Sequence, residues 1–168
     1  MHGRTYIQGP WTTSNGFEVK VGDHFINVVN STGVLNANLI PPSYMHVAKV
    51  PLQAGDSDDI AFAWQNPVDA DILVHRVIVD ITAAGGTASS VMDVGVTNAN
   101  DGTDDCFFDD MNINSVKVED HLRTAGAGQG GVHKVDQRGG TNDYITGKIL
   151  AANANDLEGN VYIYYTSV

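Results

Sequence analysis

The chain has 168 residues, a formal net charge of −11, 42% hydrophobic residues and 17% charged residues. This length fits one domain with or without an arm, and the hydrophobic content argues against a wholly disordered acidic chain. Its five lysines and four arginines are scattered, whereas phosphate-backbone binding needs clustered bases. We therefore expect no direct nucleic-acid partner and no anionic membrane partner. Because Cys106 is the single cysteine, no intrachain disulfide can form.

The residue types within this composition favour strands and turns. Seventeen of the 20 acidic residues are aspartate, with 18 glycines and 14 asparagines, and these three types serve turns. Valine, isoleucine and threonine number 20, 11 and 12 against seven leucines, and β-branched residues suit pleated strands. The composition predicts an all-β chain with short connections, and it excludes a helical bundle.

Residues 1–43 form a first zone that we expect to be an arm or a set of added strands. Residues 17–21 and 25–29 are short strand-like segments, and an apolar run at 34–40 is stopped by Pro41 and Pro42. An arm of this size usually needs a neighbouring surface to cover its apolar side chains.

Residues 44–168 form a second zone with about eight strand signals at near-regular spacing. The signals fall at 44–52, 60–64, 72–81, 91–97, 116–122, 132–135, 144–150 and 161–165. Segment 72–81 is apolar on both faces, so we expect it in the centre of a sheet. Segment 106–113 is ambiguous, because Phe107, Phe108 and Met111 can anchor one helical turn.

The fold class predicted from this pattern is an antiparallel jelly roll or β-sandwich, residues 44–168, with the N-terminal extension added to it. The last strand is expected to place Val161, Ile163 and Tyr165 on one face. Its other face then carries Tyr162 and Tyr164. The absence of a repeat with a period of 20 to 50 residues disfavours a propeller or solenoid.

The six histidines give no metal-site spacing, since no two of them lie at i, i+2 or i, i+4. His75 is the most interesting of them because it lies inside the longest strand signal. A satisfied or interface histidine is the favoured interpretation, and a role as ligand or base is the alternative.

Residues 101–110 contain five aspartates and no basic residue. The favoured interpretation is a solvated loop with aspartate caps. A calcium site is the alternative, because calcium takes six to eight oxygen ligands. An acidic contact patch is the third possibility. The EF-hand pattern fails, since Ala99 and Thr97 occupy ligand positions if Gly102 is its glycine.

No catalytic, cofactor-binding or metal-ligating residue is assigned, and no cofactor is expected apart from that calcium alternative. Acidic neighbours suppress the thiolate of Cys106, which we interpret as a small buried hydrophobic residue. The glycine-rich segment 124–131 lacks the features of a phosphate-binding loop. A pair of carboxylates for glycoside cleavage stays open, since their separation depends on the three-dimensional structure.

Aromatic side chains leave two interpretations open. Exposed aromatic residues on a β surface stack on sugar rings or become buried at a subunit contact. The candidates are Trp11, Trp64, Tyr162, Tyr164 and Tyr165.

Six segments of this chain together resemble the jelly-roll structural proteins of tailed bacteriophages. They are 60–67 (IAFAWQNP), 72–82 (ILVHRVIVDIT), 91–96 (VMDVGV), 108–114 (FDDMNIN), 144–147 (YITG) and 157–165 (LEGNVYIYY). The resemblance covers about residues 46–168 and is a pattern of strands and turns without a catalytic signature.

The resemblance implies a non-enzymatic virion protein, in particular a head decoration or cement protein on the capsid surface, made in the host cytoplasm. It implies the major capsid protein and further copies of the same chain, often a trimer, as partners. No catalytic residue follows from it. The extension at 1–43 departs from the compact pattern and is also compatible with a place in the tail.

Two other function classes remain as alternatives. One is a carbohydrate-binding or receptor-binding module of a tail or fibre, which predicts exposed Trp or Tyr in a groove. The other is a glycan-active enzyme, which predicts two carboxylates facing each other across a cleft.

Overall fold

The computed structural model divides the chain into two compact units, Met1–Tyr44 and Met45–Val168. It describes the backbone of residues 17–21, 24–29 and 36–38 in the first unit, and residues 45–84, 86–87, 89–124 and 130–168 in the second. Trp11, Pro41, Pro42 and residues 125–129 of the glycine-rich segment lie outside the described residues.

The first unit contains a three-stranded antiparallel sheet in the order β1–β2–β3. Its strands are β1 (Phe17–Val21), β2 (His24–Val29) and β3 (Asn36–Asn38). In this sheet Val19 lies opposite Ile26 and Phe17 opposite Val28. The strand-like segments expected at 17–21 and 25–29 thus belong to two paired strands.

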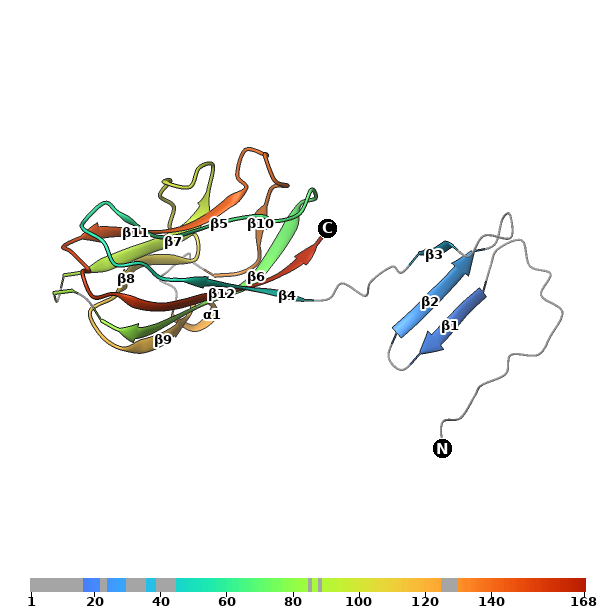
Figure 1. Cartoon of the computed structure of the whole chain (residues 1–168), viewed down its shortest axis with the longest axis horizontal. Helices are drawn as coiled ribbons and strands as arrows, with labels where there is room; N and C mark the ends of the chain where they lie inside the picture. Colours follow the sequence, from blue (N-terminus) through green and yellow to red (C-terminus); the bar gives the residue numbers. More distant parts are fainter. Residues whose placement is uncertain are drawn as a thin grey trace, which may run out of the picture. The chain divides into compact units, whose positions relative to one another are not determined.

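The second unit contains two antiparallel sheets, and one of them has five strands (Figure 1). Its strands are β4 (His46–Pro51), β6 (Ile72–Ala83), β9 (Lys117–Asp120), β10 (His133–Val135) and β12 (Glu158–Ser167). The order is β4–β12–β6, and β9 and β10 pair with different ends of β6. As expected from its two apolar faces, β6 is a central strand.

The other sheet has four strands in the order β5–β11–β7–β8. They are β5 (Ile60–Gln65), β7 (Val91–Thr97), β8 (Phe108–Asn112) and β11 (Tyr144–Ala151). The predicted segment 91–97 has the same bounds as β7, and the other predicted strands differ from the observed ones by a few residues at most.

Strands of the second unit pair in a nested order along the chain. The first strand, β4, pairs with the last, β12, and the second, β5, pairs with the penultimate, β11. Inside these pairs, β6 lies beside β9 and β10, and β7 beside β8. Because β9 and β10 share one position beside β6, each sheet has four strand positions. Two such sheets connected in this order make a jelly roll. The predicted all-β sandwich is confirmed.

The core lies between the two sheets and is built by the inward-facing residues of their strands. In β6, Val74, Val77, Val79 and Ile81 are fully buried, and in β12 Val161 and Ile163 are fully buried. Met92 and Ile149 contribute from the other sheet. Burial of each such side chain contributes roughly 1.5–3 kcal/mol to folding, so these inward positions determine which residues are left facing outward.

Two expectations for the middle of the chain are corrected. The helical turn considered for 106–113 is absent there, because residues 108–112 form strand β8. The strand expected over 116–122 ends at Asp120, and a single helical turn, α1 (His121–Thr124), follows it. None of the described residues forms a helix long and apolar enough to cross a membrane.

Candidate interaction face

The outward side of the five-stranded sheet is rich in aromatic and aliphatic side chains. We name it the tyrosine face and define it by seven residues from four strands. They are Val47, Lys49, Arg76, Ile78, Val118, Tyr162 and Tyr164. Along β6 and β12 these outward residues alternate with buried ones. At two margins of the face Val47 and Val118 are 53% and 65% exposed.

Two rows of neighbours cross this face from strand to strand. Tyr162 lies opposite Lys49 of β4 and opposite Ile78 of β6. Tyr164 lies opposite Val47 and Arg76 in the next row. Directly opposed side chains contact each other in antiparallel sheets, so each tyrosine is flanked by one basic and one aliphatic residue.

Basic groups lie over both tyrosine rings. The Lys49 ammonium and the Arg76 guanidinium are each 5.9 Å from the centroid of their ring, Tyr162 and Tyr164 respectively. At this distance the positive charge is attracted by the face of the ring. The contacts orient the rings and keep the basic groups against the sheet.

Arg76 also binds Asp120 at the edge of the tyrosine face. Its Nη2 donates to Asp120 Oδ2 at 2.6 Å and its Nε donates to Oδ1 at 3.2 Å. This two-point contact lowers the pKa of the Asp120 carboxyl, chiefly through the hydrogen bond from Arg76. The pair of Arg76 and Asp120 therefore adds no net charge to this face, although residues 45–168 carry the whole net charge of −11.

The outward side of the four-stranded sheet is different, because the loop that follows β7 folds back over it. Thr146 Oγ1 donates to the carbonyl oxygen of Gly102 at 2.9 Å. A Cβ atom on Gly95 would overlap with Asp104. Gly95 and Thr97 are therefore buried although they lie on the outward side of the sheet.

The acidic run at 101–110 is divided by the fold. Asp104 caps the loop by accepting from the Cys106 amide at 2.9 Å. Asp109 and Asp110 lie instead beside Asp93, and carboxylate oxygens of these three residues lie within 4.8 Å of one another. The pKa of Asp93 is raised, chiefly by burial, with further contributions from the nearby carboxylates. Calcium takes six to eight oxygen ligands, so one oxygen from each of these three residues would supply half of the smallest coordination shell.

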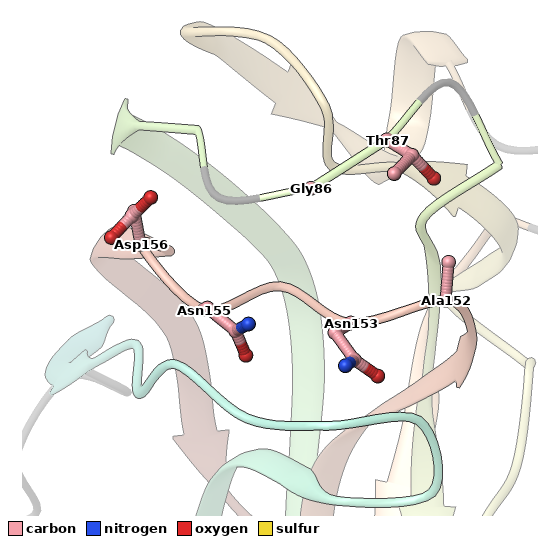
Figure 2. A pocket seen from close by; sticks show the side chains of 6 residues that line it. All are labelled: Gly86, Thr87, Ala152, Asn153, Asn155 and Asp156. Carbon is pink, nitrogen blue, oxygen red and sulfur yellow. The ribbon is translucent and has the colours of Figure 1, made fainter.

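A polar recess of about 540 Å³ lies at one end of the sandwich, between the connection from β6 to β7 and the loop before β12. Figure 2 shows Asn153, Asn155 and Asp156 on one side of this recess and Gly86 and Thr87 on the other. The Asn153 Oδ1 atom accepts from the Ser57 amide at 3.2 Å. Asp156 is the one ionisable side chain among the described lining residues, so no pair of titratable groups converges there.

Other candidate residues from the sequence have structural contacts. His75 Nε2 lies 2.8 Å from Thr166 Oγ1, as expected for a satisfied histidine. Trp64 packs against the core, 5.3 Å from the Tyr165 ring, so it does not form an exposed platform for a sugar. Burial raises the pKa of the Cys106 thiol to about 12.

Comparisons with known proteins give one structural match. No family model matches the sequence, and neither does any curated protein. The chain is similar to a chain of the solved structure described as "Cyanophage Pam1 capsid asymmetric unit", at 16% identity and a TM-score of 0.40. The match covers 82% of this chain and 99% of that chain.

Proposed function

We propose that this protein is a structural protein of a tailed-phage virion, which binds the outside of the capsid shell and stabilises it as a decoration or cement protein. In this proposal its partners are the major capsid protein and further copies of itself, in a trimer. It works on the virion surface after synthesis in the host cytoplasm. It contacts neither nucleic acid nor a membrane, and it catalyses no reaction.

The tyrosine face is the observation that carries the proposal. Tyrosine and arginine are enriched at protein interfaces, and charged residues are depleted at the centres of such interfaces. On this face Tyr162, Tyr164 and Ile78 occupy the middle, and the basic side chains of Lys49 and Arg76 lie over the two rings. The arrangement suits adhesion to another protein.

Physical chemistry explains how adhesion alone performs this function. A protein that binds the assembled shell and not its dissociated subunits stabilises the shell by its binding free energy. Several copies joined in one oligomer multiply modest contacts through effective concentration. The sequence resemblance of residues 46–168 to phage jelly-roll structural proteins agrees with this function.

Co-sedimentation with bare capsids tests the proposal. The wild-type chain is expected to pellet with expanded capsids, and the Tyr162→Ser/Tyr164→Ser variant is expected to lose at least tenfold in affinity. The loss follows because aromatic residues at the centre of an interface typically contribute about 2 kcal/mol or more each.

Tyr144→Ser is the matched control, since Tyr144 is a half-buried tyrosine on the outward side of the other sheet. It should bind capsids as the wild type does. Absence of wild-type binding to every capsid form would overturn the proposal, and so would equal losses for the two variants.

A carbohydrate-binding or receptor-binding module is the second candidate, and the placement of the two tyrosines favours it specifically. Tyr162 and Tyr164 are two residues apart on one side of β12, which separates them by about 7 Å along the strand. Aromatic rings on a flat sheet can stack on sugar rings. Retention on a polysaccharide matrix that Tyr162→Ser abolishes, with no capsid binding, would select this function.

A further inference from the structure

Strands β4 and β5 are edge strands of their sheets, and neither has a further strand neighbour among the described residues. The two edges lie on the same side of the sandwich, because residues of both strands line one recess of about 480 Å³. One hydrogen bond joins the two sides, in which the Gln53 amide donates to the carbonyl oxygen of Ala61 at 2.7 Å. After Ala61, the structure gives the edge of β5 no backbone partner on this side within the part of the chain that it describes.

The pairing of β5 with β11 determines which backbone groups point toward this free edge. Asn66 follows β5, and its amide donates to the carbonyl oxygen of Asp143 at 2.8 Å. In an antiparallel ladder, residues alternate between bonding to the partner strand and pointing away from it. Ala63 and Gln65 therefore direct their N–H and C=O groups away from β11. Ala61 agrees with this alternation, because its carbonyl oxygen is the one that Gln53 binds.

The other free edges of the second unit carry side chains that oppose pairing with a foreign strand. Charged residues and proline are common means of protecting an exposed edge. Strand β4 contains Lys49 and Pro51, β8 contains two aspartates, and β9 and β10 contain charged residues as well. Strand β5, with the sequence IAFAWQ, contains neither a charged residue nor a proline. Its edge is therefore chemically open to another strand.

The recess beside this edge has apolar walls and one negative charge. Val50 and Pro51 of β4 line it together with Ile60 and Ala63 of β5. Asp101, from the loop after β7, is exposed and is the one ionisable side chain among the described lining residues. Such a recess suits an extended segment that brings both apolar and basic side chains, since pockets beside an edge select the side chains of an added strand.

We propose that β5 is a docking strand, which adds an extended basic segment of a partner protein to the four-stranded sheet. The free N–H and C=O groups of Ala63 and Gln65 bind the backbone of that segment. The apolar walls accept its alternate side chains, and Asp101 pairs with a lysine or arginine.

A second copy of this chain is a poorer occupant of the recess, because each copy carries a net charge of −11 and the same Asp101. Like net charges oppose association. The identity of the partner rests on the proposed function, under which the segment belongs to the major capsid protein.

A short synthetic peptide of alternating valine and lysine, with blocked ends, tests the docking strand without capsids. In ¹⁵N NMR spectra of the full chain, this peptide is expected to shift the amides of Ala63 and Gln65 and to slow their exchange with solvent. A peptide of alternating valine and glutamate should do neither, because Asp101 and the net charge repel it. Absence of these changes with the lysine peptide would overturn the proposal, and so would equal changes with both peptides.

Two substitutions of Ala63 separate the edge hydrogen bonds from general attraction. Ala63→Pro removes one edge N–H and places a ring where the segment would lie, so the lysine peptide should bind at least about tenfold more weakly. Ala63→Ser keeps this N–H at the same exposed position and should bind as the wild type does. Equal affinities of the two variants would contradict the docking strand. If Ala63→Pro does not fold, Ala63→Lys replaces it, because an added positive charge at the edge should also repel the lysine peptide.

The charge of Asp101 is tested by a matched pair of variants. Asp101→Asn should weaken binding of the lysine peptide roughly two- to fivefold, as expected for an exposed ion pair. Asp69→Asn removes the same charge from another exposed position, which does not line the recess, and should leave the affinity unchanged. Equal losses for the two variants would show that the peptide responds only to the net charge.

Hydrogen-exchange mass spectrometry of the chain on expanded capsids tests the partner itself. Residues of β5 should gain protection on binding. Capsid binding without this protection would overturn the docking strand and leave the proposed function intact. Absence of all capsid binding would refute the proposed function, whereas the peptide experiments decide the docking strand independently.

Sedimentation of the peptide-free chain tests the other occupant. Ala63→Pro is expected to leave its oligomeric state unchanged. A concentration-dependent dimer of the wild type that Ala63→Pro abolishes would show that β5 pairs with β5 of a second copy, and it would overturn the assignment to a basic segment.

Discussion

The aromatic ring of Phe62 occupies the space that a Cβ atom on Gly147 would take. The two residues are cross-strand partners on β5 and β11, and both are buried. A residue without a side chain is thus required at the centre of the four-stranded sheet so that the ring can enter the core.

Gly147→Val is therefore expected to destabilise the fold. Overpacking a core typically costs about 1–3 kcal/mol, and we expect the upper end of this range or more because Phe62 is enclosed. Urea unfolding followed by tryptophan fluorescence measures the loss.

Gly139→Ala is the control, since nothing lies within 4 Å of the new Cβ atom. It introduces only left-handed backbone strain of about 1–2 kcal/mol. An equal or smaller loss for Gly147→Val would contradict the packing explanation.

Asn66 fixes the connection between the two sheets. We expect Asn66→Ala to lower the free energy of unfolding by about 3 kcal/mol, because the buried hydrogen-bond partners of Asn66 are left unsatisfied. The fully buried side chain donates to the carbonyl oxygens of Ala70 and Asp136 and accepts from the Val68 amide. Thermal and urea unfolding measure the change. Asn155→Ala, at an exposed position of the recess, is the control, and its free energy of unfolding should stay within about 0.5 kcal/mol of the wild-type value. Similar losses of stability for the two variants would refute the role assigned to Asn66.

The Cys106 thiol is expected to react slowly in the folded protein. Burial raises its pKa from 9.0 to about 12, so the thiolate fraction near neutral pH falls by roughly a thousandfold. Alkylation by iodoacetamide should be correspondingly slow under native conditions and should become fast in denaturant. Alkylation at the rate of an ordinary exposed cysteine in the folded chain would show that the thiol is accessible and ionised.

Asp93→Asn is expected to stabilise the protein at neutral pH by less than about 1 kcal/mol, because Asp93 is partly exposed to solvent. The raised pKa of Asp93 means that the folded state holds the proton more tightly than the unfolded state does. Its stabilising contribution is therefore present at low pH and is lost as the pH rises through the folded pKa.

Melting temperatures of the wild type and Asp93→Asn between pH 3 and pH 7 check this sign, and the gain should shrink toward the acid end. The asparagine oxygen can still accept from the Asp110 amide, as Asp93 Oδ1 does at 2.8 Å. A calcium-dependent rise in the wild-type melting temperature that Asp93→Asn abolishes would contradict simple repulsion and would support a cation site.

Residues 108–112 show why this part of the fold was ambiguous in the sequence. Phe108 and Met111 are buried, and the two residues between them, Asp109 and Asp110, are exposed. This spacing of three imitates a helical turn. Its cause is an irregularity in the pairing with β7 between Met92 and Val94, with Asp110 at a positive φ of 49°. An inserted residue of this kind restores the inward direction after two outward side chains.

One part of the tyrosine face was predictable from the sequence, namely the placement of its two tyrosines. Strict alternation over residues 161–165 places Tyr162 and Tyr164 together on one side, and the structure agrees. Their neighbours Lys49 and Arg76 come from strands far away in the sequence, so only the sheet register brings them together. Nothing in the sequence distinguishes His121 from the other histidines, because only the fold places its Nδ1 atom where it accepts from the Val77 amide at 2.8 Å.

The nested strand order has a consequence for biosynthesis. Strand β12 is synthesised after the other described strands of the second unit, yet it lies in the interior of the five-stranded sheet, between β4 and β6. The ribosome must therefore release nearly the whole jelly roll before that sheet can close, and pairing across such long sequence separations is slow. Until then the edges of β4 and β6 that pair with β12 stay unpaired, and unpaired strand edges favour aggregation of the incomplete chain.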